Sequence, residues 1–467
     1  MSRRLVVLEL NEVPARVLYR AADHGCGHIA RLLDEAAVHT TRMTETLPRE
    51  PYPSQSWASL GTGAPWSEHG IWWYNDPKPA EHPFYWERAA RAGHSVGLLN
   101  VLHSSPIEGR LDNARFRFVV PDVFASDNAT IPAELSPFHD LCATMARANA
   151  RTSHTGVGRG LHGALGPLTH IGLRPTTAAR IAALVAGVSA GRLPRERLRL
   201  GLFLLHGDLF SHLMRRHDPD LAVLFTNHVA SAMHRYWYAA FPGDFDERHY
   251  DDAWVARYGG EIDAAMSLVD RFLGRLIRWA DGTGRTIAIA SSMGQGASAT
   301  LDTGRTHEAV VVDAARLLDA LDVPGQPRIQ AAMHPQLTLE FETTDDAERA
   351  AEILAPARFD TIAHAVDRRD RCVTLTEAPV VHHESQVRLD GANVAARHVG
   401  LDIRGVDDHS SGRHTRDGVL VIRGPGTTPG QGDDIDLRDV ADHLLALLGI
   451  DHGQPAAATA ASPGGNR

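Results

Sequence analysis

Lysine is almost absent from this chain. Lys78 is the single lysine among 47 lysine and arginine residues. A base-composition bias toward arginine codons explains the general scarcity, yet a compact ammonium group differs chemically from a planar guanidinium. Lys78 is therefore a candidate for a specific role in binding an anion, with an ordinary surface lysine as the alternative.

Cysteine is also scarce. The chain has 3 cysteines, Cys26, Cys142 and Cys372, which are widely spaced and form no Cys-x-x-Cys pair. An odd number of scattered cysteines is typical of reduced thiols. This pattern predicts a cytoplasmic protein.

Long hydrophobic runs are missing as well. No apolar stretch approaches the ~20 residues that span a bilayer, and the first apolar run, Leu5–Leu10, is too short for a secretion signal. The formal net charge of −10 argues against a nucleic-acid backbone as the main partner. We expect a small anionic substrate and neither a membrane nor a nucleic-acid polymer as partner, while the oligomeric state stays undetermined.

Short apolar runs alternate with helical stretches, within a composition of 43% hydrophobic and 22% charged residues that can bury a large core. This alternation predicts a layered α/β fold with buried parallel strands. The expected strands are Leu5–Leu10, Ser95–Leu102, Leu221–Thr226, Thr286–Ser291 and Val419–Ile422, and the clearest expected helices are Ile29–Ala37, Ile262–Ala280 and Leu437–Leu448.

Composition changes along the chain predict its division into parts. An Ala-, Arg- and Gly-rich stretch at 140–200 favours a helical insertion or cap, and a period-two pattern at Gln336–Phe341 favours a strand of a smaller α+β subdomain. We expect the core α/β domain in residues 1–139, 201–325 and 396–452, the insertion at 140–200, the α+β subdomain at 326–395, and a disordered tail at 453–467.

One segment concentrates chemical groups. Residues 53–63 read Pro-Ser-Gln-Ser-Trp-Ala-Ser-Leu-Gly-Thr-Gly, and residues 67–71 read Ser-Glu-His-Gly-Ile. The segment resembles the nucleophile region of the alkaline phosphatase superfamily, nearest its type I phosphodiesterase branch, in which a Thr or Ser precedes a Trp, a Thr-Gly turn and a His-Gly-Ile. The resemblance extends in order over residues 5–449, excluding the insertion. It implies an alkaline-phosphatase-like layered fold with a central, mostly parallel sheet.

The resemblance also implies a site for two metal ions, but the carboxylate ligands have changed. In the superfamily, one ion is held by an Asp of the first strand, the nucleophile and an Asp-His pair, and the other by an Asp-x-x-x-His segment and a late His. The corresponding positions here are Asn11 and Ser291-Ser292 for the first site, and Ala230, His234 and His414 for the second. Asn and Ser are weak zinc ligands. The chain is therefore expected to hold at most one divalent metal, zinc or manganese, or none.

Histidines remain the main metal candidates. His234 and His414 match the family pattern, and His228 is a doubtful third ligand because it lies six residues before His234 and so faces another side of a regular helix. Asp407, Asp408 and His409 are alternative ligands near the late histidine. For any single histidine, a structural hydrogen-bonding role is the simpler interpretation.

The nucleophile position is ambiguous. Counting back from the Thr62-Gly63 turn, it falls on Pro53, which leaves Ser54 and Ser56 as hydroxyl candidates. Without a metal, either serine would need a base such as His69 or His414. The structural alternative is that both serines cap a helix that begins near Trp57.

Strand ends and one aromatic loop supply candidate substrate contacts, because ligands of open α/β sheets bind beyond the C-terminal ends of the strands. The predicted catalytic residues are Ser54, Ser56, His234 and His414, and the predicted substrate-binding residues are Asn11, Trp73, Lys78, Ser291, Ser292 and Gln295.

Three functions remain open from the sequence. The first is a hydrolase or group transferase that acts on a phosphate, phosphodiester or sulfate ester of a small substrate, such as a nucleotide or sugar. The second is a metal-independent group-transfer enzyme that reuses the anion-binding crevice. The third is a catalytically inactive anion-binding protein of the same fold.

Overall fold

The computed structural model describes residues 3–147, 172–299, 301, 307–330, 337–355, 366–375, 380–381, 386–389, 391–405 and 410–450. Asp407, Asp408 and His409, the tail predicted at 453–467 and part of the predicted insertion lie outside the described residues.

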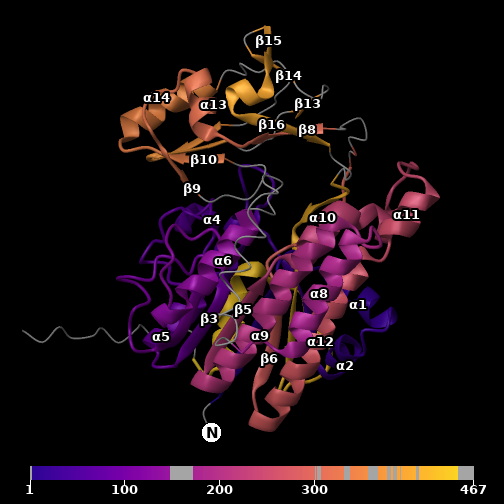
Figure 1. Ribbon diagram of the computed structural model, residues 1–467. Coiled ribbons are helices and arrows are strands. Elements are labelled where there is room, and N and C mark those ends of the chain that lie inside the picture. Colours follow the sequence, from indigo (N-terminus) through magenta and orange to yellow (C-terminus); the bar gives the residue numbers. More distant parts are fainter. Residues whose placement is uncertain are drawn as a thin grey trace, which may run out of the picture.

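A nine-stranded sheet forms the centre of the larger body (Figure 1). β1 (Leu5–Leu10) lies between β5 (Leu221–Thr226) and β6 (Thr286–Ser291), and runs parallel to both. Every residue of these three strands is buried, which explains their continuous apolar sequences. The remaining strands are β3 (Val96–Val101) and β4 (Phe116–Pro121) on one side, and β18 (Asp417–Arg423), β2 (Ala37–Arg42), β19 (Gly430–Gln431) and β20 (Ile435–Asp436) on the other.

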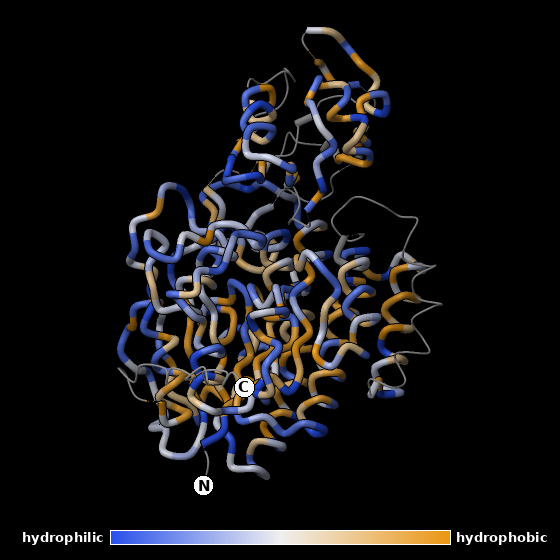
Figure 2. The backbone as a smooth tube through the Cα atoms, turned by 90° about the vertical axis from the view of Figure 1, so that its left-hand side faces the viewer, coloured by the Kyte–Doolittle hydropathy of each residue, from blue (hydrophilic) through white to orange (hydrophobic). Residues whose placement is uncertain are grey.

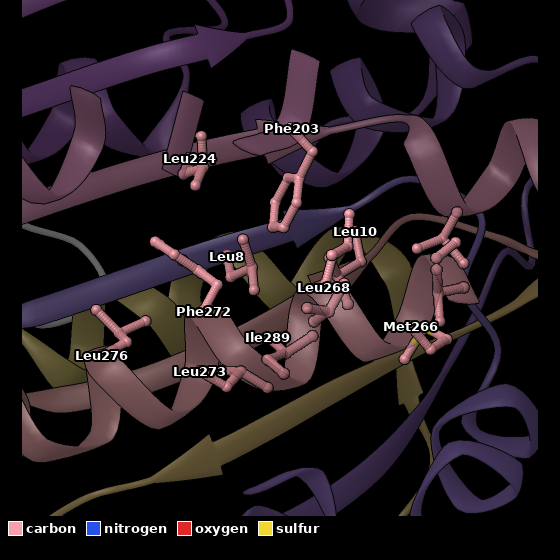
Figure 3. Close-up of a cluster of buried hydrophobic side chains, with 14 of the residues drawn as sticks. Leu8, Leu10, Phe203, Leu224, Met266, Leu268, Phe272, Leu273, Leu276 and Ile289 are labelled. Carbon is pink, nitrogen blue, oxygen red and sulfur yellow. The ribbon is translucent and has the colours of Figure 1, made fainter. Parts of the chain in front are cut away.

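Helices cover both faces of this sheet, so the predicted α/β layered class is confirmed. Alternate residues of β1 face opposite ways: Val6, Leu8 and Leu10 pack into one hydrophobic cluster, and Leu5 and Val7 into the other. Figure 3 shows the first of these, where Leu8, Leu10 and Ile289 meet Phe203 and Phe272. The helices on the face of Leu8 and Leu10 include α1 (Ala15–Asp23), α2 (Gly27–Glu35), α9 (Leu200–His217), α10 (His228–Ala240) and α12 (Glu261–Thr283). The helices on the opposite face of the sheet include α3 (Pro53–Thr62), α5 (Tyr85–Arg91) and α15 (Val440–Leu447).

The prediction that all these strands are parallel is wrong for β18, which pairs antiparallel with both β6 and β2. β18 follows β17 (Gly412–Thr415), which pairs with β7 (Gly294–Ala297) just beyond the end of β6. The chain therefore enters β18 at the C-terminal edge of the parallel strands. With one residue between β17 and β18, no crossover helix fits, so the strand runs back through the sheet.

Further helical elements complete the larger body: α4 (Trp66–His69), η1 (Ala133–Leu135), α6 (Ser136–Arg147), α8 (Pro175–Ser189), η3 (Arg195–Arg199), η4 (Pro242–Asp244), α11 (Asp252–Tyr258) and η6 (Leu437–Asp439). Within the predicted insertion at 140–200, every regular element among the described residues is helical. Among the described residues, no helix combines the length and apolar character needed to cross a membrane.

A smaller α+β body sits above the sheet in Figure 1 and has its own hydrophobic cluster. This cluster takes in residues from Val311 to Ile403, so it reaches beyond the range 326–395 on both sides. Figure 2 shows that hydrophobic stretches are more concentrated inside the larger body. The elements of the smaller body are β8 (His307–Val311), α13 (Ala314–Ala320), β9 (Arg328–Gln330), β10 (Leu337–Glu340), α14 (Thr344–Leu354), β11 (Val366–Arg369), β12 (Cys372–Leu375), β13 (Val380–Val381), β14 (Gln386–Leu389), β15 (Ala392–Ala395), η5 (Ala396–Val399) and β16 (Leu401–Gly405).

Candidate active site

Glu12, His234 and His414 form a compact cluster at the C-terminal edge of the sheet. Their ligand atoms lie within 4.8 Å of one another. Glu12 follows β1, His234 lies on α10 after β5, and His414 lies on β17. The Glu12 carboxylate Oε2 is 2.9 Å from His234 Nε2 and 3.4 Å from His414 Nε2. Two imidazoles and one carboxylate thus converge on a single point.

Backbone carbonyls orient both rings. His234 Nδ1 lies 3.1 Å from the Gly412 carbonyl oxygen, and His414 Nδ1 lies 3.0 Å from the Pro51 carbonyl oxygen. Each Nδ1 therefore carries the proton that it donates. The remaining nitrogen, Nε2, is directed toward Glu12, and this is the arrangement by which proteins prepare histidines for metal binding.

Electrostatics couple the three groups. Burial would raise the pKa of Glu12, but His414 and His234 outweigh burial and hold that pKa well below its usual value. Burial would likewise lower the pKa of His414, but the Glu12 carboxylate and its hydrogen bond raise it. The carboxylate is therefore ionised, and it attracts positive charge to this point, from protonated imidazoles or from a cation.

Two amide side chains hold the Glu12 carboxylate. Asn11 Nδ2 donates to Glu12 Oε1 at 2.7 Å and to Asn227 Oδ1 at 2.7 Å, and Gln295 Nε2 donates to Glu12 Oε2. The Asn11 carbonyl oxygen accepts a hydrogen bond of 2.8 Å from Trp57 Nε1. Asn11, predicted to bind substrate, is thus buried with both ends of its amide engaged, and it positions Glu12.

Helix α3 begins next to the cluster. Tyr52 occupies the N-cap, Pro53 is the first helical residue, and no side chain caps the helix. The alternative in which Ser54 and Ser56 cap a helix starting near Trp57 is therefore wrong. Proline favours the first helical position because its missing N–H costs nothing there, and the helix consequently starts four residues earlier.

The two candidate hydroxyls are inside this first turn and fully buried. The Ser54 hydroxyl donates to the Trp72 carbonyl oxygen. The Ser56 hydroxyl lies 2.7 Å from that of Ser292 and donates to the Pro53 carbonyl oxygen at 3.2 Å.

The other predicted residues at the end of β6 are buried too. Ser291 Oγ donates to the Met293 carbonyl oxygen at 2.6 Å. Ser292 pairs with Ser56, and Gln295 binds Glu12. The structure therefore brings all three predicted polar residues to the site, where their described contacts are to protein groups.

His228 lies apart from the cluster. Its Nδ1 is 2.7 Å from Thr226 Oγ1, its Nε2 is 3.3 Å from the Ala265 carbonyl oxygen, and its ring stacks on Phe203 at 4.1 Å. Burial lowers the pKa of His228 to about 3. The prediction of His228 as a third ligand conflicts with this geometry, because both ring nitrogens are engaged elsewhere.

His69, considered as a base for the serines, contacts Ser59 instead. Ser59 Oγ donates to Glu45 Oε1 at 2.7 Å, and His69 Nε2 lies 3.0 Å from Ser59 Oγ. His69 Nδ1 accepts from the backbone N–H of Ile71 at 3.0 Å. The hydroxyl proton thus goes to Glu45, so His69 donates to Ser59 and does not act as its base.

Lys78 and Trp73 lie in the loop between α4 and α5. The Lys78 ammonium donates to the carbonyl oxygens of Tyr74, at 2.8 Å, and Asp76. Burial lowers the pKa of Lys78 to about 8. Trp73 Nε1 donates to Asp367 Oδ2 at 2.9 Å, which ties the loop to β11 of the smaller body.

Glu12 is the member of the cluster that was not predicted from the sequence. The family pattern places the first-strand carboxylate at position 11, where this chain has Asn. The carboxylate of this chain stands one position later, at Glu12, whose backbone is left-handed with φ 59°. The sequence feature that could have indicated Glu12 is the polar Asn11-Glu12 pair directly after the first strand.

The donor set fits one divalent cation. Two imidazole nitrogens and one carboxylate oxygen match catalytic zinc sites, which keep a further position open. The second metal position of the superfamily does not fit, because Asn11, Ser291 and Ser292 bring no carboxylate and their polar groups have protein partners.

Comparison with known proteins places the chain in a family. Among solved structures, phosphonoacetate hydrolase from Sinorhizobium meliloti in complex with phosphonoacetate is 16% identical, with a TM-score of 0.42 and coverage of 96% of both chains. An inactive form of murine ectonucleotide pyrophosphatase / phosphodiesterase 5 in complex with AMP is 13% identical, with a TM-score of 0.38 and coverage of 96% of this chain and 95% of that one. No curated protein sequence matches the chain. The model of one family, described as type I phosphodiesterase / nucleotide pyrophosphatase, matches residues 5–355. This protein belongs to the type I phosphodiesterase / nucleotide pyrophosphatase family.

Proposed function

We propose that this protein is a hydrolase of small phosphoester or phosphodiester substrates that works with a single divalent cation. The observation that carries the proposal is the convergence of Glu12, His234 and His414, whose ligand atoms lie within 4.8 Å of one another. Family membership supports phosphoester chemistry. A bound cation of this kind supplies Lewis acidity at a phosphoryl oxygen and lowers the pKa of water.

The side chains around the cluster have defined tasks in this proposal. Asn11 and Gln295 hold the Glu12 carboxylate, and the carbonyls of Gly412 and Pro51 fix the two rings. The start of α3 lies beside His414 through Pro51, so the positive end of the helix dipole favours an anionic substrate at this edge.

Ser54 and Ser56 position the start of α3 in this proposal. Their hydroxyls are fully buried and hydrogen-bonded to Trp72, Pro53 and Ser292. A hydroxyl in that state cannot reach a phosphorus atom without breaking these contacts. Water is therefore the proposed acceptor of the phosphoryl group, which makes the reaction a hydrolysis.

Metal content and hydrolysis, measured on the same protein preparations, test the proposal. Elemental analysis of the purified protein after equilibration with Zn²⁺ or Mn²⁺ should give about one ion per chain, and His414→Ala should lose it. His443→Ala is the matched control, because His443 is exposed on α15. Bis(p-nitrophenyl) phosphate and p-nitrophenyl phosphate report diesterase and monoesterase activity, and a chelator should abolish either one.

The ionised Glu12 and the raised pKa of His414 favour one specific alternative, a metal-free ion pair that supports metal-independent chemistry. Activity that survives chelation in metal-free protein would replace the proposal with that alternative. Absence of turnover with both esters, despite one bound ion, would leave an inactive anion-binding protein.

A further inference from the structure

A cavity of about 370 Å³ lies between α9 and α12, near the start of α8. Figure 1 shows these three helices side by side on one face of the sheet. The cavity is lined by the apolar side chains of Phe210, Met214, Phe272, Leu276 and Trp279, by Ser211, and by four arginines, Arg174, Arg215, Arg275 and Arg278. Its volume falls within the range of about 300–1,000 Å³ typical of small-molecule sites.

The cavity is remote from the candidate active site. Arg275 and Trp279 lie in the last turns of α12, which ends at Thr283, just before β6 begins at Thr286. This is the N-terminal end of β6, whereas Glu12, His234 and His414 lie beyond the C-terminal ends of the parallel strands. The two sites therefore lie at opposite edges of the sheet.

Positive charge is in excess around the cavity. Asp208 is the buried carboxylate nearest the arginines, at 3.9 Å from Arg174 Nε and 3.7 Å from Arg275 Nη2. Its other oxygen accepts the backbone N–H of Arg174 at 2.9 Å. Among the described residues, no carboxylate forms an ion pair with Arg215 or Arg278. Among the described residues, Asp208 is thus the carboxylate partner of two of these four arginines, Arg174 and Arg275.

Arg275 also has unused hydrogen-bonding capacity. Its Nε is buried and has no hydrogen-bond partner among the described residues. Burial, followed by repulsion from Arg174 and other arginines, lowers the pKa of Arg275. A buried donor without a partner is unfavourable, and an oxyanion that reached the Arg275 guanidinium would supply an acceptor.

We propose that this cavity is a second ligand site, which takes an amphiphile whose carboxylate or phosphate head binds the arginines and whose apolar body lies on Phe210, Phe272 and Trp279. Arginine binds both oxyanions through paired N–H···O bonds, which explains the choice of head. The aromatic and aliphatic lining explains the apolar body, since an inorganic anion would leave that surface uncovered.

Isothermal titration calorimetry of the full-length protein tests the proposal, with decanoate and decyl phosphate as probes below their micellar concentrations. At least one probe should bind with a stoichiometry near one, and decanol and inorganic phosphate should bind at least tenfold more weakly. The comparison of the two probes identifies the preferred head group. Glu12→Gln, which alters the other edge of the sheet, should bind the probe as the parent protein does.

Three arginine variants on α12 separate the cavity from general electrostatic attraction. Arg275→Gln and Arg278→Gln should each weaken binding about tenfold, which corresponds to one charge-assisted contact. Arg271→Gln is the matched control, because Arg271 is exposed on the same helix and does not line the cavity. Arg278 is exposed, so its variant remains informative if Arg275→Gln fails to fold. Failure of both probes to bind, equal binding of decanol, or equal effects of all three variants would overturn the proposal.

Discussion

Glu12 lies one position after the residue at which the family pattern places a carboxylate, and its carboxylate lies 2.9 Å from His234 Nε2. A carboxylate at position 12 reaches the histidines because the backbone turns into the left-handed region there, with φ 59°. Such a conformation is uncommon for a residue with a side chain and persists only where surrounding contacts hold it. Asn11 and Gln295 provide such contacts through the carboxylate.

Replacing Glu12 by Gln should lower metal affinity at least tenfold. The variant keeps the shape of the side chain but removes the charge that faces both histidines. Glu9→Gln is the matched control, since Glu9 is a buried glutamate of the same strand region outside the cluster. Equilibrium dialysis followed by elemental analysis measures the change, and equal metal content in both variants would contradict the assignment.

Ser56 and Ser292 are joined by one hydrogen bond, so the same substitution can be compared at both residues. If both hydroxyls are structural, Ser56→Ala and Ser292→Ala should each cost about 1 kcal/mol of unfolding free energy and should change hydrolysis to a similar, small extent. Urea denaturation and initial rates with bis(p-nitrophenyl) phosphate measure the two effects. A loss of activity of about a thousandfold confined to Ser56→Ala would instead identify Ser56 as a nucleophile.

The position of the candidate site is easier to predict from the sequence than its members are. His234 and His414 were recognisable from the family pattern, whereas Glu12 was hidden because a one-residue displacement breaks the alignment that reveals it. The role of Asn11 depends on Trp57 and Asn227, far away in the chain, so no local pattern could indicate it. Likewise, the burial of Ser54 and Ser56 depends on how α3 packs.

At the scale of elements, β17 determines where His414 lies. This strand packs so tightly against α10 that Gly412 has no room for a side chain. A Cβ atom there would meet the Met233 carbonyl oxygen at 2.6 Å and Gln295 Oε1 at 2.7 Å. The same residue gives its carbonyl oxygen to His234. One glycine thus fixes the positions of both histidines.

Gly412→Ala should therefore weaken metal binding at least tenfold and lower thermal stability, because β17 must move away from α10. Gly282→Ala is the matched control: a Cβ at Gly282, near the end of α12, meets nothing within 4 Å, and alanine favours a helix by roughly 0.5–1 kcal/mol. Metal titration and thermal melting measure both variants. Unchanged metal affinity in Gly412→Ala would show that β17 tolerates the shift.

Strands were predicted more reliably than their directions. Continuous apolar runs indicate burial on two faces, and β1, β5 and β6 were predicted with the bounds that they have in the structure. The run at 419–422 carries the same signal, yet β18 is antiparallel. Direction depends on the edge at which the chain enters the sheet, and the short connection from β17 decides it.

At the scale of the whole molecule, the central strand carries a buried acid. Burial raises the pKa of Glu9 to about 8, although the hydrogen bond from Tyr85 opposes this. Between the ordinary glutamate pKa of 4.5 and about 8, the folded protein keeps a proton that the unfolded chain has released. Stability from this group is therefore complete below the lower value and is lost as the pH rises toward the upper one.

Glu9→Gln should make stability less dependent on pH across that window. The neutral amide has no proton to lose, so the variant should be more stable than the parent at pH 8.5, and this advantage should shrink at pH 5.5. Each unit of pKa difference corresponds to about 1.4 kcal/mol, so the total effect is on the order of a few kcal/mol. Urea denaturation at the two pH values measures it, and parallel pH profiles would contradict the protonated state of Glu9.

The place of β18 has a consequence for the order in which the chain can fold during synthesis. β2, at residues 37–42, pairs within the described sheet with β18, β19 and β20, all of which come after residue 416. A ribosome must therefore complete most of the chain before β2 gains a neighbour. Until then, the edges of β2 and β6 are open to other chains. Premature termination before β17 would leave an aggregation-prone product that lacks both His414 and β18.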